Sequence, residues 1–179
     1  MTMSFPSPED LNTVIFRALS RGLALAGAAD SCLLRRAYQN PMPPPSPDRD
    51  VLYYHHAPEG DSELTEPCLS PSGGPCLFRF LPLRLTLTFY GPRAETLAWG
   101  MARRMMQDGP DTPRRILRAA RIYPLPGVPS PQEVWEIWKE AHRLRVDLTL
   151  RLRLAAAEED ESPTSGLVDS VPEIHIHTV

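Results

Sequence analysis

Apolar and polar residues alternate without a break over residues 144–154. The apolar positions are Leu144, Val146, Leu148, Leu150, Leu152 and Leu154, and the residues between them are Arg145, Asp147, Thr149, Arg151 and Arg153. Because successive side chains of a β-strand point to opposite faces, this pattern gives one apolar face and one charged face. A helix would distribute the same leucines around its circumference. The segment is therefore predicted to be a strand with one buried face, as is common in antiparallel sheets.

The same alternation recurs over residues 83–90, in which Arg84 and Tyr90 belong to the polar set. Threonine and aromatic residues suit strands, and Gly91-Pro92 ends the segment. We predict that both strands lie in one sheet, with their leucine faces under helices and their polar faces toward water or another subunit. The candidate interface residues on these polar faces are Arg84, Tyr90, Arg145, Arg151 and Arg153.

Three other segments have the residue pattern of helices. Ser7-Pro8 followed by two acids is a typical helix start, while Gly22 and Gly109 are expected to end two of the helices. The expected helices cover residues 8–21, 94–106 and 113–119, and short strands are expected over residues 32–38, 51–56 and 121–124. The predicted fold class is therefore α/β (α+β): a small, mainly antiparallel or mixed sheet with two main helices packed on one face.

Ser130 and Glu133 have the spacing of a capping box, which predicts a short helix before the long strand. This helix would carry Trp135 and Trp138. The two tryptophans fit either the core or a binding surface, and the usual burial of large aromatic residues favours the core.

Proline-rich and acidic segments set the expected domain organisation. Residues 1–154 are predicted to form one domain that includes a Pro-rich loop at 41–76, and residues 155–179 an acidic linker and a C-terminal β-arm. In this arm Ile174 and Ile176 alternate with histidines, so it is suited to adding a strand to the edge of its own sheet or of a neighbouring copy's sheet.

Composition and motifs argue against several classes of function. The net charge of −3 combines an Arg-rich body with an acidic C-terminal region, which leaves open either nucleic-acid contact or complementary surfaces between copies. We identify no nucleophile elbow, phosphate loop or protease signature, so neither an enzyme nor a cofactor is expected. His175 and His177 could ligate zinc, but their spacing from the cysteines matches no standard site, and a solvent-facing strand is the simpler interpretation.

The targeting patterns and the cysteine content of the sequence indicate only the cellular compartment of the protein. The sequence shows no apolar run of transmembrane length and no secretory signal pattern. Its three cysteines leave one unpaired in any disulfide scheme, which fits a reducing cytoplasm.

The order of these elements provides a further clue. A capped N-terminal helix precedes a strand ending Tyr38-Gln39-Asn40-Pro41. An alternating strand ending Phe89-Tyr90-Gly91 is followed directly by an Ala-rich helix, and a tryptophan-bearing segment leads into the long Leu/Arg strand. Over residues 8–154 this arrangement resembles the tail or neck terminator proteins of tailed bacteriophages and similar small head–tail completion proteins.

The resemblance implies a non-enzymatic virion protein that is assembled in the bacterial cytoplasm. Copies would form a closed ring, usually of six, at the head-proximal end of the tail, where the ring stops growth of the tail tube. The implied partners are other copies, the tail tube protein, the head–tail connector or neck proteins and, in a contractile tail, the sheath. Genome DNA would pass through the lumen without specific binding. A head–tail connector subunit and an Arg-rich nucleic-acid-binding regulatory domain remain the alternatives.

Overall fold

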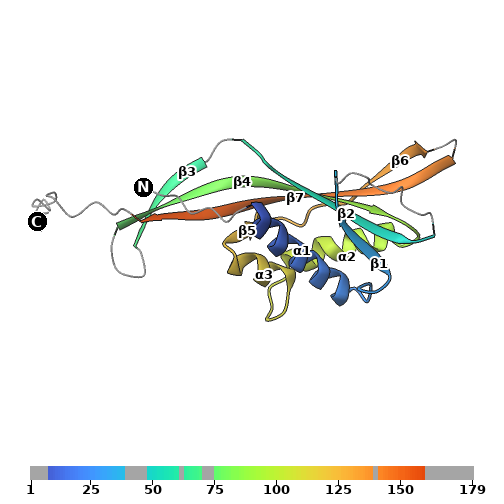
Figure 1. Cartoon of the computed structure of the whole chain (residues 1–179), viewed down its shortest axis with the longest axis horizontal. Helices are drawn as coiled ribbons and strands as arrows, with labels where there is room; N and C mark the ends of the chain where they lie inside the picture. The colour runs from blue at the N-terminus through green and yellow to red at the C-terminus, as the bar shows by residue number, and fades with distance from the viewer. Residues whose placement is uncertain (1–7, 39–47, 61–62, 70–74, 139–140, 160–179) are drawn as a thin grey trace, which may run out of the picture.

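The computed structural model describes residues 8–38, 48–60, 63–69, 75–138 and 141–159. Within these residues, three helices lie on one face of a seven-stranded, mainly antiparallel sheet, which confirms the predicted α+β class (Figure 1). In chain order the elements are α1 (Pro8–Leu25), β1 (Cys32–Arg36), β2 (Asp50–Pro58), β3 (Glu63–Leu69), β4 (Pro75–Tyr90), α2 (Ala94–Met106), α3 (Pro113–Ala119), β5 (Ile122–Pro124), β6 (Gln132–Trp138) and β7 (Ala141–Glu159).

Two long antiparallel strands, β4 and β7, form the centre of the sheet. The strand order is β1-β2-β4-β7-β5, with β3 also paired to β4 and β6 also paired to β7. Thus β2 and β3 share one edge of β4, while β5 and β6 share the outer edge of β7. Only β1 and β2 run parallel in the described part of the chain.

The two alternating segments lie in one sheet, as predicted, and the structure shows that they pair directly with each other. Leu85 lies opposite Leu150 and Leu87 opposite Leu148, so both leucine rows point to the same face. All four side chains are buried in the core beneath the helices. Removing each such side chain from water contributes about 1.5–3 kcal/mol, so this double row is a major source of stability.

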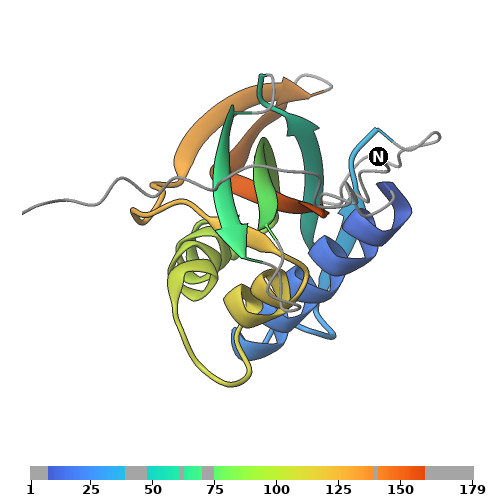
Figure 2. The same ribbon diagram turned by 90° about the vertical axis from the view of Figure 1, so that its left-hand side faces the viewer.

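The helices cover only the middle of the sheet. In Figure 1 the β4–β7 pair extends past the helical layer at both ends, and Figure 2 shows a curled sheet with the three helices packed together on one side of it. Val51 and Tyr53 are buried although the β2 register directs them away from the helices. No helix in the described residues is long and apolar enough to cross a membrane.

Helix α1 runs four residues beyond the expected end at residue 21. Gly22 does not stop it, because this glycine is a packing site: a Cβ atom there would lie 2.5 Å from the sulfur of Met101 in α2. Likewise, Gly109 does not cap α2, which ends at Met106 with Gln107 as its extended C-cap residue.

A buried carboxylate fixes the start of α2 against the sheet. Asp50 on β2 accepts hydrogen bonds from the backbone N–H of Arg93, at 2.9 Å, and from its Nε atom, at 2.7 Å. Gly91, at φ 111°, makes the preceding turn, where a Cβ atom would lie 2.7 Å from the carbonyl oxygen of Arg49. Only glycine fits this close approach at a positive φ, so the strand-to-helix connection is tightly specified.

Three expectations about extended segments were wrong. Besides the expected strand at 51–56, the expected Pro-rich loop at 41–76 contains strand β3 and the first two residues of β4, and residues 155–159 belong to β7 rather than to a linker. The capping-box segment is strand β6, not a helix. Its β-branched and aromatic residues suit a strand, and pairing with the edge of β7 outweighs the local helix-start signal.

Candidate functional site

The polar face of the β4–β7 pair carries most of the predicted interface residues. Arg84 lies directly opposite Arg151, and Tyr90 lies opposite Arg145. Arg153 follows on the same face, opposite Pro82. Ile174 and Ile176 lie outside the described residues. The structure therefore brings the five described candidates onto one face, as the alternation predicts.

These five residues differ in what they contact. Arg84 is exposed, and the Arg151 side chain is 71% exposed and lies 3.8 Å from the carboxylate of Glu59. Like charges directly opposite each other on neighbouring strands are destabilising. The Arg84–Arg151 pair therefore makes an exposed basic patch that costs stability and is suited to an acidic partner surface.

Arg145, by contrast, is held inside a half-buried network. It donates to Asp147 at 2.7 Å and to Glu136 of β6 at 3.3 Å. Burial lowers the Arg145 pKa, but the hydrogen bond and charge of Asp147 outweigh this effect and raise the pKa overall. Arg145 thus forms ion pairs with Asp147 and Glu136, and it joins β6 to β7 rather than pointing into solvent.

Tyr90 belongs to the same network. Its hydroxyl donates to Glu136 at 3.4 Å, and the guanidinium carbon of Arg143 lies 4.4 Å from the centre of its ring. Burial, and then the charge of Glu136, raise the Tyr90 pKa, so the phenol keeps its proton at neutral pH. Within the described residues, Oδ1 of Asp147 and Nη2 of Arg143 are buried without a hydrogen-bond partner.

The end of the β6–β7 hairpin bears exposed apolar side chains. Trp135 is 66% exposed and Ile137 is 74% exposed. Both are on the helix side of the sheet, because they lie opposite Leu144 and His142, but no described helix reaches this far (Figure 1). The favoured core position for Trp135 was therefore wrong, and the side chain of Trp138 is outside the described residues. We call Trp135 and Ile137 the apolar tip.

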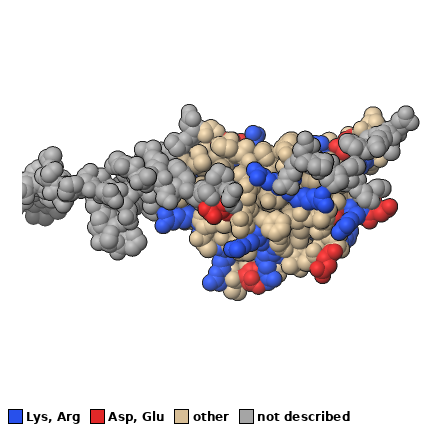
Figure 3. All heavy atoms as spheres, in the orientation of Figure 1, with Lys and Arg blue, Asp and Glu red and all other residues tan. Residues whose placement is uncertain are grey.

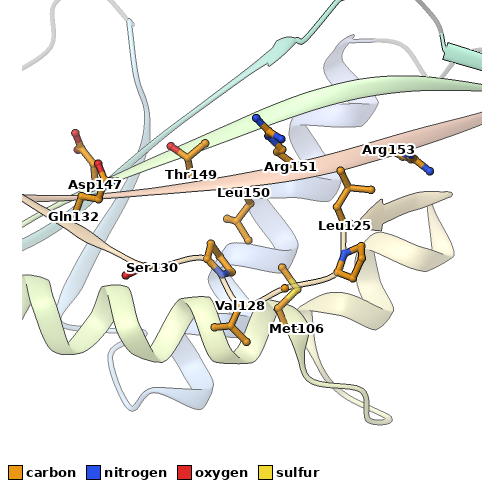
Figure 4. A pocket seen from close by; sticks show the side chains of 13 residues that line it. Met106, Leu125, Val128, Ser130, Gln132, Asp147, Thr149, Leu150, Arg151 and Arg153 are labelled. Atoms are coloured by element: carbon orange, nitrogen blue, oxygen red, sulfur yellow. The ribbon is translucent and has the colours of Figure 1, made fainter.

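A hollow of about 750 Å³ lies at the outer edge of β7, between the apolar tip and β5. Figure 4 shows Leu150, Val128 and Met106 below the strand, with Thr149 and Arg151 above it. The hollow exists because β5 ends at Pro124, opposite Leu152, and β6 begins at Gln132, opposite Asp147. Since the N–H of Leu125 also donates to the carbonyl oxygen of Arg151, three β7 residues, 148–150, have no partner strand on this edge within the described residues, and we call them the edge gap.

Three prolines explain why the connecting segment does not fill the edge gap. Pro126, Pro129 and Pro131 have no N–H group to donate to a strand ladder. The gap was not predicted, although prolines between two segments that pair with the same strand indicate an interrupted strand edge.

The nucleic-acid alternative would use Arg103, Arg104, Arg114, Arg115 and Arg118, and four of these five arginines are engaged within the protein. Arg104, Arg114 and Arg115 donate to the carbonyl oxygens of Leu25, Met106 and Pro110, respectively. Arg114 and Arg118 also pair with Asp108. Figure 3 shows basic side chains over the helical layer interspersed with acidic ones, not a continuous basic stripe. This arrangement gives little support to a nucleic-acid surface.

The other candidate chemistry concerns cysteines and metals. Burial, and then the charge of Asp50, raise the pKa of the free Cys32 thiol to about 11, so this thiol is unreactive at neutral pH. Cys68 lies opposite Cys76 in the β3–β4 register. Among the described residues, no group of three or more His, Cys, Asp or Glu residues is placed to hold a metal ion. His175 and His177 lie outside the described residues.

Searches with this chain against protein-family models and against curated proteins find no match. A functional assignment therefore rests on the residues and geometry described above.

Proposed function

We propose that this chain is a structural virion protein that forms a closed ring at the head-proximal end of a phage tail. The ring ends the tail tube and joins the tail to the head. Its partners are further copies, the tail tube protein, the neck or connector proteins and, in a contractile tail, the sheath. The proposal starts from the order of elements in the sequence and is supported by the surfaces that the fold leaves uncovered.

The observation that carries the proposal is a sheet longer than the helical layer that covers it (Figure 1). One end of this sheet bears the apolar tip, and the centre of its opposite face bears the Arg84–Arg151 patch. A single copy thus exposes two surfaces of different chemistry, one apolar and one basic. Contacts between unlike surfaces are heterologous, and heterologous contacts make a ring when the rotation between copies closes.

A head–tail connector subunit would have similar surfaces, so the geometry favours assembly without choosing between a terminator and a connector. The test that separates assembly from the nucleic-acid alternative is native mass spectrometry of the purified chain with negative-stain electron microscopy. We expect one closed oligomer with an open lumen. A chain that stays monomeric at all concentrations and binds duplex DNA with steep salt dependence would overturn the proposal.

A further inference from the structure

We propose that the edge gap of β7 is a strand-accepting site, and that its occupant is the segment Ile174-His175-Ile176 of the same chain. The segment would run antiparallel to β7, with His175 opposite Thr149. This inference does not depend on ring formation or on the proposed virion function.

The backbone of β7 defines what the gap can bind. The N–H of Leu125 donates to the carbonyl oxygen of Arg151, and the N–H of Ala155 donates to the carbonyl oxygen of Arg121. Odd-numbered β7 residues therefore direct their backbone groups to the outer edge, since these groups alternate sides along an antiparallel strand. Thr149 is the odd-numbered residue at the centre of the gap. Within the described residues, no strand pairs with Thr149 on this edge.

The side chains around the gap match the alternation of the segment. Below β7 the hollow is apolar, being lined by Leu150, Val128 and Met106 (Figure 4). Above β7 it is polar, with Thr149 flanked by Asp147 and Arg151. With His175 on the Thr149 side, Ile174 and Ile176 both face the apolar hollow. Sliding the segment by one residue would place histidines in the hollow instead.

Charge selects the antiparallel direction. Only residues 174–176 fit in the ladder, because Leu125 and Gln132 already occupy the edge positions beside Arg151 and Asp147. Glu173 then leaves the gap at its Arg151 end, and His177 leaves it at its Asp147 end, where Oδ1 of Asp147 has no hydrogen-bond partner in the described part of the chain. In the parallel direction, Glu173 would instead meet Asp147, and a protonated His177 would meet Arg151. Both strands already paired with this edge, β5 and β6, also run antiparallel to β7.

The residues between β7 and the segment Ile174-His175-Ile176 are numerous enough for the segment to reach the edge gap of its own chain. The ten steps along β7 from residue 149 to residue 159 span about 33 Å, at about 3.3 Å per residue. The 15 residues from 160 to 174 can span at most about 50 Å when fully extended. A tethered segment has an effective concentration in the millimolar range when its linker can span the distance. Occupancy by the chain's own segment is therefore favoured over exchange between copies.

The test is disulfide trapping in the full-length chain, with the three native cysteines replaced by alanine and with oxidised glutathione as oxidant. We expect the Thr149→Cys, His175→Cys variant to form a disulfide within one chain, because directly opposed residues of a hydrogen-bonded pair have Cα atoms about 5.5 Å apart, within the range that a disulfide bridges. The matched control is Thr149→Cys with Ile174→Cys, which places the thiols on opposite faces and is expected to trap at least tenfold more slowly.

Equal trapping in the two variants, or no trapping in either, would refute the proposed register. A disulfide found only between chains, seen as a dimer on a non-reducing gel, would refute occupancy by the chain's own segment. Hydrogen exchange provides a readout without cysteines: deletion of residues 173–179 is expected to speed exchange at the Thr149 amide at least tenfold. An unchanged rate would count against the site.

Discussion

Arg84 of β4 and Arg151 of β7 lie directly opposite each other on the exposed face of the sheet. Within one copy this arrangement is unfavourable, because like charges that face each other across a strand pair repel. A surface that retains such a pair is suited to binding an acidic surface. The first prediction follows from this relationship.

Charge reversal at Arg151 and Arg153 is expected to prevent ring assembly without unfolding the domain. Both side chains lie on the face away from the core, so the free energy of unfolding should change by less than about 0.5 kcal/mol, as for most surface substitutions. Native mass spectrometry gives the oligomeric state, and urea denaturation gives the stability. The control, Arg17→Glu with Arg103→Glu, reverses two exposed arginines of the helical layer and should still assemble. Normal rings from the Arg151, Arg153 variant would show that this face is not an interface.

A charged substitution at Leu150, which neighbours Arg151 on β7, is expected to destabilise the domain. Leu150 is 1% exposed, so Leu150→Asp places an unpaired carboxylate in the core and should lower the free energy of unfolding by about 4 kcal/mol or more. Circular dichroism during urea denaturation measures this loss. Leu150→Met conserves volume and should cost less than about 1.5 kcal/mol. A well-folded Leu150→Asp protein would mean that the two faces of β7 have been assigned the wrong way round.

Replacing both residues of the apolar tip by serine is expected to abolish assembly while leaving the monomer stable. Trp135 and Ile137 are largely exposed and contribute little to the core of one copy. Sedimentation velocity measures assembly, and thermal denaturation measures stability. Phe16→Ser removes an exposed aromatic side chain from the helical layer and should have no effect on the oligomer. Rings that persist without the tip residues would exclude the tip from the contact between copies.

His56 predicts a loss of stability at acidic pH. Its Nε2 atom lies 2.9 Å from Oδ1 of Asn12, and burial, followed by the charges of Arg36 and His55, lowers its pKa below the ordinary value of 6.5. As pH falls through about 6.5, the unfolded chain takes up a proton that the folded chain does not, so the free energy of unfolding decreases.

Urea denaturation between about pH 7.5 and pH 5.5 measures this effect. His56→Gln is expected to reduce the pH dependence, whereas His142→Gln, at an exposed position, is expected to keep it. The same pH dependence in wild type and His56→Gln would assign the effect to another group.

The alternation of apolar and polar residues predicted the central strands β4 and β7, because these strands are buried on one face only. The alternation around Leu85 and Leu150 defines both the strands and the face that the helices cover. The apolar stripes of α1 and α2 were equally readable. Gly22 was wrongly expected to end α1, because the sequence gives no information on how closely Met101 of α2 packs against it.

The candidate site was only partly predictable, because its features depend on pairing over long sequence separations. Strand β6 was taken for a helix on the basis of Ser130 and Glu133, whereas the free edge of β7 decides its conformation. The exposure of Trp135 depends on where α2 begins relative to the tip, since α2 follows Tyr90, which lies opposite Arg145. Arg145 and Tyr90 were correctly placed on the polar face, but their shared contact with Glu136 required β6 to be a strand.

The most direct test of the proposed function is electron microscopy of lysates from a phage in which this gene carries an early stop codon. We predict free heads beside tails of irregular or excessive length, because the tube would grow without a terminating ring. Normal-length tails beside heads that fail to join would instead assign the protein to the head-side connector. Normal infectious particles would contradict a structural role in the virion.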